Sequence, residues 1–176
     1  GHYAAARGYL ERALALWAEI GDERWPRYGR VYLAQALIGL GDLDAGLEIL
    51  HSALNEHVQA KDLDGQIEAA GSIALAYARK GEYVEARRLY SHACQLAQTI
   101  TEPSLVLAES LRQASIVEEL CGDPAAALKH EDDAWRIYRR AGMQRRAMES
   151  RRRARLLRQR IRRGASPRTH QAELAL

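Results

Sequence analysis

The sequence is poor in the residues that cross-link, interrupt or anchor a chain. Its 176 residues include two Cys, four Pro and no Phe. No run of about 18 apolar residues occurs, so we expect no membrane span. Two cysteines, Cys94 and Cys121, cannot build a disulfide framework, which favours a reducing compartment and hence the cytoplasm. The few prolines and the scarcity of Ser and Thr argue against a long disordered segment before the C-terminal end.

The residues that are abundant favour helices. Ala, Leu, Arg and Glu dominate while Val and Thr are sparse, so the composition predicts an all-α protein. With 47% hydrophobic residues, the chain is long enough to bury a core, either as one domain or as a short repeat array.

The formal net charge of +3 hides an uneven distribution of charge. Residues 1–138 hold 13 Lys and Arg against 21 Asp and Glu, a balance of −8. Residues 139–176 hold 13 Arg against two Glu, a balance of +11. An acidic body therefore carries a strongly basic end, and any function must account for that asymmetry.

A period of about 40 residues runs along the chain. It is marked by Gly1, Gly41, Gly81 and Gly122, which are spaced by 40, 40 and 41 residues. Five residues after each glycine stands a small residue, and twelve residues after it an alanine: Ala6, Gly46, Ala86 and Ala127, then Ala13, Ala53, Ala93 and Ala134. Small residues in fixed positions indicate helix pairs that pack closely, unit after unit.

The period, together with residues that typically start or end helices, predicts eight helices. Pro26, Pro103 and Pro124 fall where a helix should begin, and Asp42 and Asp123 follow repeat glycines as N-caps. The glycines themselves suit the left-handed position that ends a helix. We expect helices at 2–20, 26–40, 42–60, 65–80, 82–100, 104–121, 123–141 and 143–163.

One unit carries a known signature most clearly. It reads Ile73-Ala-Leu-Ala-Tyr77 and continues with Gly81, Tyr83, Ala86, Tyr90 and Ala93. This pattern resembles the helix-turn-helix unit of tetratricopeptide (TPR) repeats, although the common unit has about 34 residues. The longer unit is similar to the C-terminal sensor arrays of bacterial signalling ATPases and transcription regulators. The resemblance implies a TPR-like α-solenoid of antiparallel helix pairs in a right-handed superhelix.

The resemblance also implies a division of the chain. We expect a repeat array over 1–142, an arginine-rich capping helix over 143–163 and a disordered tail over 164–176. The array holds about three and a half units, because residues 1–20 correspond to the second helix of a unit. A first helix is then expected upstream, in a longer protein of which this chain is a C-terminal piece. Without that helix, Leu10, Leu14 and Trp17 should be partly uncovered.

Acidic residues interrupt the pattern near the end of the array. Glu118 and Glu131 stand where the family usually has an apolar or aromatic residue, which predicts a degenerate fourth unit at an end that faces solvent. The acidic run 131–133 is then either a solvated face or a partner for the arginine helix.

The resemblance assigns a binding groove to the first helix of each unit. Its positions lie about thirteen, ten, nine and six residues ahead of each repeat glycine. Carried over to this chain, the predicted groove residues are Tyr28, Val31, Tyr32, Gln35, Glu68, Ser72, Leu75, Glu109, Arg112, Gln113 and Ile116. The known groove that clamps a terminal carboxylate with Lys, Asn and Arg is not reproduced, so a receptor for chaperone tails is not expected.

Tyr28 and Tyr32 are the most suggestive of these residues. A tyrosine supplies contact area and a hydroxyl group at little entropic cost. The competing interpretation is that one of the two merely packs on the neighbouring unit.

The segment 143–163 is amphipathic. An apolar stripe follows Met143, Ala147, Ser150, Ala154, Leu157 and Ile161. Ten arginines occupy the remaining positions: Arg145, Arg146, Arg151, Arg152, Arg153, Arg155, Arg158, Arg160, Arg162 and Arg163. The helix could cap the array, contact a protein partner or another copy of the chain, or bind phosphate groups of nucleic acid.

No motif for catalysis or cofactor binding is present. The chain has neither a Gly-x-x-x-x-Gly-Lys-Ser/Thr loop nor a Gly-x-Gly-x-x-Gly loop. Two His–acid pairs share a helical face, Glu48 with His51 and His130 with Asp133, but such pairs are usually solvated surface. Cys94 and Cys121 are expected to be buried structural thiols. We therefore predict a protein that is not an enzyme and holds no metal or cofactor.

These observations favour an interaction and sensing module of a bacterial signalling or transcription regulator. Its partner is expected to be a protein or peptide segment in the groove. A nucleic-acid-binding segment that uses the arginine helix, or self-association into a homo-oligomer, remains as an alternative, and no membrane is expected.

Overall fold

Over the residues that the structure describes, the chain folds into a row of eight helices. The computed structural model describes residues 2–100 and 105–164. The helices are α1 (Tyr3–Glu19), α2 (Arg24–Gly39), α3 (Leu43–Gln59), α4 (Leu63–Lys80), α5 (Tyr83–Gln98), α6 (Leu105–Leu120), α7 (Pro124–Arg140) and α8 (Gln144–Arg162). Each predicted helix is present, and each predicted bound lies within two residues of the observed one. Pro103 and the tail beyond Gly164 lie outside the described residues.

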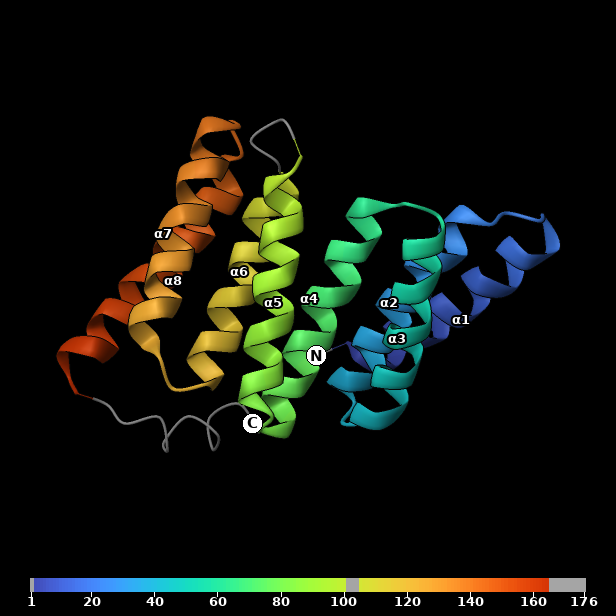
Figure 1. Ribbon diagram of the computed structural model, residues 1–176, viewed down its shortest axis with the longest axis horizontal. Coiled ribbons are helices and arrows are strands. Elements are labelled where there is room, and N and C mark those ends of the chain that lie inside the picture. The colour runs from blue at the N-terminus through green and yellow to red at the C-terminus, as the bar shows by residue number, and fades with distance from the viewer. Residues whose placement is uncertain (1, 101–104, 165–176) are drawn as a thin grey trace.

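The helices pack as successive antiparallel hairpins. Each helix contacts the next along the chain, and α4 also contacts both α2 and α6. Helices α2, α4 and α6 therefore form a layer of their own. In Figure 1 the hairpins follow one another from α1 at one end of the row to α7 and α8 at the other.

Local chemistry sets the ends of these helices. The Asp42 carboxylate accepts a hydrogen bond from the backbone N–H of Ala45 (3.4 Å), and Asp123 accepts one from Ala126 (2.9 Å). Both are the predicted N-caps. Gly41 adopts φ +96°, a left-handed conformation that favours glycine and closes α2 before the chain turns into α3.

The small residues of the repeat lie where the helices meet. Ala53, Ala93 and Ala134 are fully or almost fully buried. At Gly46, a Cβ atom would lie 2.5 Å from Cγ1 of Ile38 and 3.1 Å from the carbonyl oxygen of Ala34, so α2 and α3 approach closely at this point. The periodic small residues are thus a requirement of close helix packing.

The first helix, α1, has no buried residue. Its main packing partner is α2, and Leu10, Leu14 and Trp17 are half-buried, as the repeat pattern predicts. Leu16 of this helix and Ile20, which follows its last turn, are exposed.

The prediction of a solvent-facing end was wrong for Glu118 and Glu131. Their side chains are only 4% and 0% exposed. Glu118 accepts hydrogen bonds from the guanidinium group of Arg87 (2.7 Å) and from the hydroxyl of Tyr90. Nε of Arg153 lies 3.1 Å from Oε1 of Glu131. Arginine partners from neighbouring helices neutralise these carboxylates, which is why acidic residues can occupy core positions.

The last helix, α8, covers that end of the row. It packs against α7 through Ala147, Ser150, Ala154 and Leu157, the buried centre of the predicted stripe. The outer members Met143 and Ile161 are each 40% exposed. The assignment of 143–163 as a separate capping domain stays a prediction.

Candidate functional site

A cavity of about 430 Å³ opens along the layer of α2, α4 and α6. Helix α2 contributes Trp25, Tyr28 and Tyr32, and α4 contributes Asp64 and Glu68. Glu109, Ser110 and Gln113 of α6 complete the wall, and Tyr138 and Arg146 close one end. The cavity therefore crosses three consecutive hairpins, as a binding groove of a helical-repeat array would.

The two predicted tyrosines differ in their contacts and in their exposure to solvent. The Tyr28 hydroxyl donates a hydrogen bond to Asp62 (3.0 Å), and its ring meets the His57 ring edge-on at 4.8 Å. Burial, followed by the bond to Asp62, raises the pKa of Tyr28. Tyr28 thus packs on the neighbouring hairpin, whereas Tyr32 is 45% exposed and open to contact.

The central carboxylate of the cavity belongs to Glu68. Nε2 of Gln35 donates hydrogen bonds to Oε1 of Glu68 (3.0 Å) and to Oγ of Ser72 (2.8 Å). Burial raises the pKa of Glu68, and the nearby Glu109 adds to that rise. No Lys, Arg or His within residues 2–100 and 105–164 forms an ion pair with Glu68.

Glu109 differs from Glu68 because its charge is compensated. It accepts a hydrogen bond from the Tyr138 hydroxyl (2.7 Å) and one from Arg146 (3.0 Å). Nη1 of Arg112 lies 3.7 Å from the same carboxylate. This cluster joins α6, α7 and α8 and forms a closed end wall. Glu68 and the exposed Asp64 are then the cavity carboxylates without an ion pair among the described residues, and Glu68 is the less exposed of the two.

The structure separates the predicted groove residues into two groups. Tyr28, Tyr32, Glu68, Glu109 and Gln113 line the cavity. The others lie in contacts between helices: Val31 and Ser72 are buried, while Gln35, Leu75, Arg112 and Ile116 are half-buried. The absence of a Cβ at Gly71 makes room for the Gln113 side chain on the wall.

Sequence reasoning missed several residues of the cavity. Trp25 and Asp64 lie about one helical turn before Tyr28 and Glu68, so helical periodicity could have found them. Tyr138 and Arg146 come from α7 and α8, outside the first helices of the units, and no sequence signal pointed to them.

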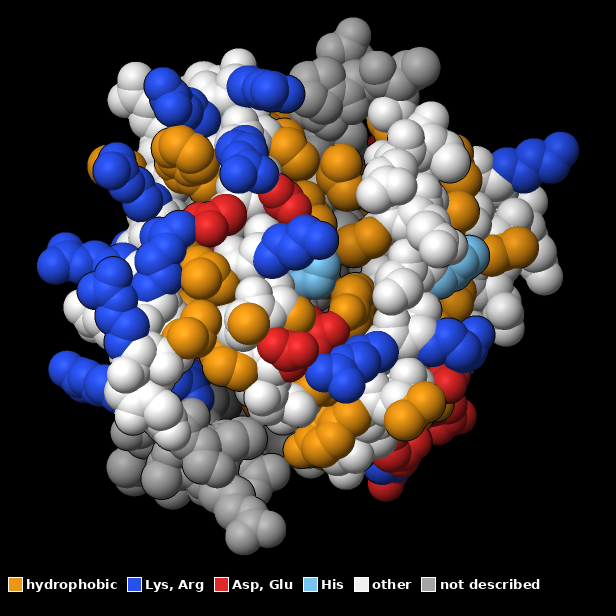
Figure 2. All heavy atoms as spheres, turned by 60° about the vertical axis from the view of Figure 1, so that its left-hand side comes forward, with side chains coloured by type: hydrophobic (Ala, Val, Ile, Leu, Met, Phe, Trp, Pro, Cys, Tyr) orange, Lys and Arg blue, Asp and Glu red, His pale blue; other side chains and the backbone are white. Residues whose placement is uncertain are grey.

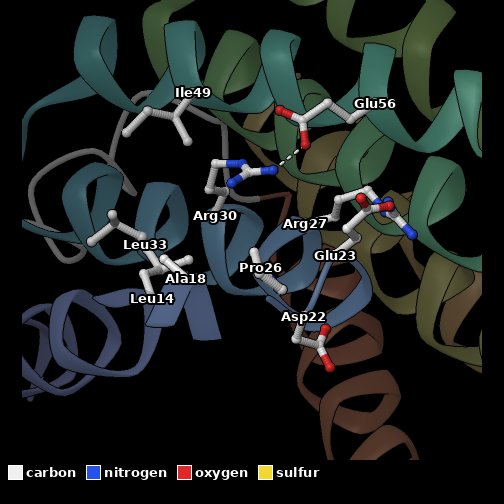
Figure 3. A pocket seen from close by; sticks show the side chains of 10 residues that line it. All are labelled: Leu14, Ala18, Asp22, Glu23, Pro26, Arg27, Arg30, Leu33, Ile49 and Glu56. Carbon is white, nitrogen blue, oxygen red and sulfur yellow. Dashed lines mark hydrogen bonds and ion pairs between the residues drawn. The ribbon is translucent and has the colours of Figure 1, made fainter. Parts of the chain in front are cut away.

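A second cavity of about 600 Å³ lies between α1, α2 and α3. Figure 3 shows Leu14 and Leu33 on one side and Ile49 on another, with Arg30 paired to Glu56 across the opening. Its charged groups already include an internal ion pair, so it is a weaker candidate for a charged ligand.

Comparison with known proteins identifies the fold. The chain matches no family model and no curated protein. It does match the crystal structure of a Podosopora anserina protein, described as a putative kinesin light chain with nearly identical TPR-like repeats, at a TM-score of 0.58 and 15% identity over 93% of this chain and 90% of that chain. A single-substitution variant of that protein gives a TM-score of 0.57 at 15% identity, over 93% of this chain and 90% of that chain. The crystal structure of BtubC (BKLC) from P. vanneervenii matches at a TM-score of 0.58 and 15% identity, over 92% of this chain and 75% of that chain.

The chain folds as a TPR-like repeat array. Identities of 15% establish the fold alone. TPR-like arrays are generally protein-interaction modules, and their concave surfaces typically bind without catalysis. Among the described residues, no helix of this array is long and apolar enough to cross a membrane.

The arginines of α8 fall into two sets in this TPR-like array. Five pair with carboxylates: Arg145, Arg146, Arg153, Arg158 and Arg160. The other five are exposed and form no ion pair with any described residue: Arg151, Arg152, Arg155, Arg162 and Arg163. Figure 2, which brings the α7–α8 end forward, shows Lys and Arg side chains gathered on one side of this face.

The acidic run on α7 supplies part of this pairing. Glu131 and Asp132 are partners of α8, since Asp132 receives two hydrogen bonds of 2.7 Å from Arg158. Asp133 instead pairs with Arg136 of its own helix. The interpretation of this run as a partner for the arginine helix is thus confirmed for two of its three residues.

The remaining candidate groups are metal ligands and the two cysteines. No cluster of three or more His, Cys, Asp or Glu side chains suited to a metal ion occurs in the described part of the chain. Cys94 and Cys121 are free thiols and are half-buried rather than fully buried. Burial raises the pKa of Cys94 to about 11, which keeps this thiol protonated at neutral pH.

Proposed function

We propose that the chain binds an extended protein segment along the groove of α2, α4 and α6, and that the segment places a cationic side chain beside Glu68. The fold supports the first part, because the concave surfaces of helical-repeat arrays serve as binding sites. The uncompensated carboxylate in an aromatic cavity supports the second part.

The observation that carries the proposal is the setting of Glu68. Its hydrogen-bond partner is the neutral amide of Gln35, and burial disfavours its charged form. A Lys or Arg side chain from a partner would supply the missing counter-charge and displace water from the cavity. The exposed ring of Tyr32 lines the same cavity and would add contact area and a surface that attracts cations.

The experiment selects ligands from a phage-displayed library of random dodecapeptides on the immobilised full chain. Enriched peptides are then titrated against the wild type and three variants, Tyr32→Ala, Glu68→Gln and the matched control Tyr9→Ala. Tyr9 is an exposed tyrosine on α1, away from the groove. Loss of an aromatic hot spot costs about 2 kcal/mol, so Tyr32→Ala should weaken binding about thirtyfold while Tyr9→Ala leaves it unchanged.

The outcomes separate the two parts of the proposal. Equal effects of Tyr32→Ala and Tyr9→Ala would refute the groove as the binding site. Selected peptides that lack Lys and Arg and bind Glu68→Gln as well as the wild type would refute the cationic preference alone. The more specific role, as a sensing part of a bacterial signalling or transcription regulator, stays a prediction from the sequence resemblance.

A further inference from the structure

The two sets of arginines on α8 differ in what their side chains contact. The stripe that packs on α7 is flanked by arginines whose partners lie on other helices. On one flank, Arg153 and Arg160 pair with Glu119 of α6. On the other flank, Arg158 pairs with Asp132 of α7. These arginines serve to hold α8 on the array.

The arginines without partners lie on the part of α8 that is exposed, away from the stripe that packs on α7. At 3.6 residues per turn, Arg151, Arg155 and Arg162 fall within about 40° of one another around the helix axis, and Arg152 and Arg163 lie about 60–80° further round. The carboxylates beneath α8 are already neutralised by the first set, so they do not cancel the field of the second. The protein thus exposes a compact surface with five uncompensated positive charges, which we name the arginine face.

We propose that the arginine face, formed by Arg151, Arg152, Arg155, Arg162 and Arg163, binds the phosphate backbone of a nucleic acid. This is a second binding surface, and it does not depend on the groove.

The chemistry of the arginine face favours phosphate groups. Every basic residue of α8 is arginine, whose planar guanidinium group can form two parallel hydrogen bonds with one phosphate. The face extends from residue 151 to residue 163, about 18 Å along the helix, and one strand of a duplex presents about five phosphates over that distance. Helix α8 contains no aromatic residue, so no base stacking is expected and binding should be independent of sequence.

A lipid surface fits the arginine face less well. A helix that lies in a membrane interface inserts a broad apolar face. The apolar stripe of α8 is instead used against α7, where Ala154 and Leu157 are buried. Met148 and Leu156 are the large apolar side chains at the exposed middle of the helix. Tighter binding to anionic vesicles than to nucleic acid would therefore contradict the proposal.

The test is fluorescence anisotropy of a labelled DNA duplex of mixed sequence, titrated with the full chain at several salt concentrations. The variant is R151Q/R155Q/R162Q. The matched control, R7Q/R12Q/R88Q, removes the same number of charges from exposed arginines of α1 and α5. Circular dichroism checks that both variants keep the helical content of the wild type.

We expect the wild type to bind with affinity that falls steeply as salt rises. Each neutralised phosphate contributes about 0.9 to the slope of log K against log salt, so the α8 variant should lower the slope by about 2.7. Its affinity at about 100 mM salt should fall on the order of a hundredfold, while the control stays close to the wild type.

Three results would overturn the proposal. The first is no binding of the duplex by the wild type at low salt, and the second is an equal loss in both triple variants. The third is tighter binding to polyglutamate or to phosphatidylserine vesicles than to the duplex at equal charge concentration. That result would assign the arginine face to an acidic protein or to a lipid surface.

Discussion

Replacing Gly65 by alanine would test how closely the start of α4 packs on the hairpin before it. A Cβ at this position would overlap the His57 ring at well under 3.0 Å, a separation that real Cβ atoms do not show. The ring is fully buried and cannot move aside freely. Its Nδ1 also lies 3.0 Å from Oδ2 of Asp62, the N-cap of α4, so displacement of the ring would disturb the cap.

The expected magnitude follows from three terms. Overpacking a core typically costs about 1–3 kcal/mol, and loss of a hydrogen bond such as His57–Asp62 costs about 1 kcal/mol. The better helix propensity of alanine returns up to about 1 kcal/mol. The net effect on the free energy of unfolding is a loss of about 2 kcal/mol, which lowers Tm by about 4–8 °C in a chain of this size.

Gly8→Ala provides the control. Gly8 lies inside α1, and a Cβ there would meet no atom within 4 Å. This substitution should therefore leave Tm unchanged or raise it slightly, because only helix propensity changes. Thermal unfolding followed by circular dichroism measures both variants. A Gly65→Ala protein at least as stable as Gly8→Ala would refute the close packing of His57 against α4.

Two further predictions concern titrating groups. Burial raises the pKa of Glu131 above its ordinary 4.5, although Arg153 and Arg112 act in the opposite direction, so the folded state retains a proton that the unfolded chain releases. The contribution of Glu131 to stability should be greatest below pH 4.5 and fall as pH rises through the raised pKa. Denaturant unfolding at several pH values measures the free energy of unfolding of the wild type and of Glu131→Gln. The wild-type value minus the variant value should fall from pH 4.5 to 7.5, and a rise over that range would contradict the prediction. With a pKa of about 11, Cys94 should be about one-thousandth thiolate at pH 8. Its alkylation by iodoacetamide, followed by mass spectrometry, should be far slower in the native chain than in denaturant, and equal rates would show that the thiol is not protected.

The helices could be predicted from the sequence because their limits depend on local interactions. Asp42 and Asp123 cap the helices that follow through hydrogen bonds to backbone groups three residues away. Gly81 ends α4 in the left-handed conformation that the period indicated. Each of these signals lies within a few residues of the structure that it specifies, so it can be read without knowing the fold.

The candidate site could be predicted only in part. Tyr32 and Glu68 lie on the groove because their helical positions place them on the exposed side of a first helix. Val31 occupies a predicted groove position but is fully buried, since neighbouring hairpins meet over it. Tyr138 reaches the cavity from α7, a contact that depends on how the hairpins are stacked.

The sequence by itself determined the helical class, the 40-residue period and the amphipathic character of residues 143–163, because composition, capping and spacing act within single helices. Only the tertiary structure decided how the charges pair. Arg87 meets Glu118 across 31 residues of sequence, and Arg153 meets Glu119 across 34. The stacking of hairpins brings these residues together, so the assembled array decides which arginines form ion pairs and which remain exposed.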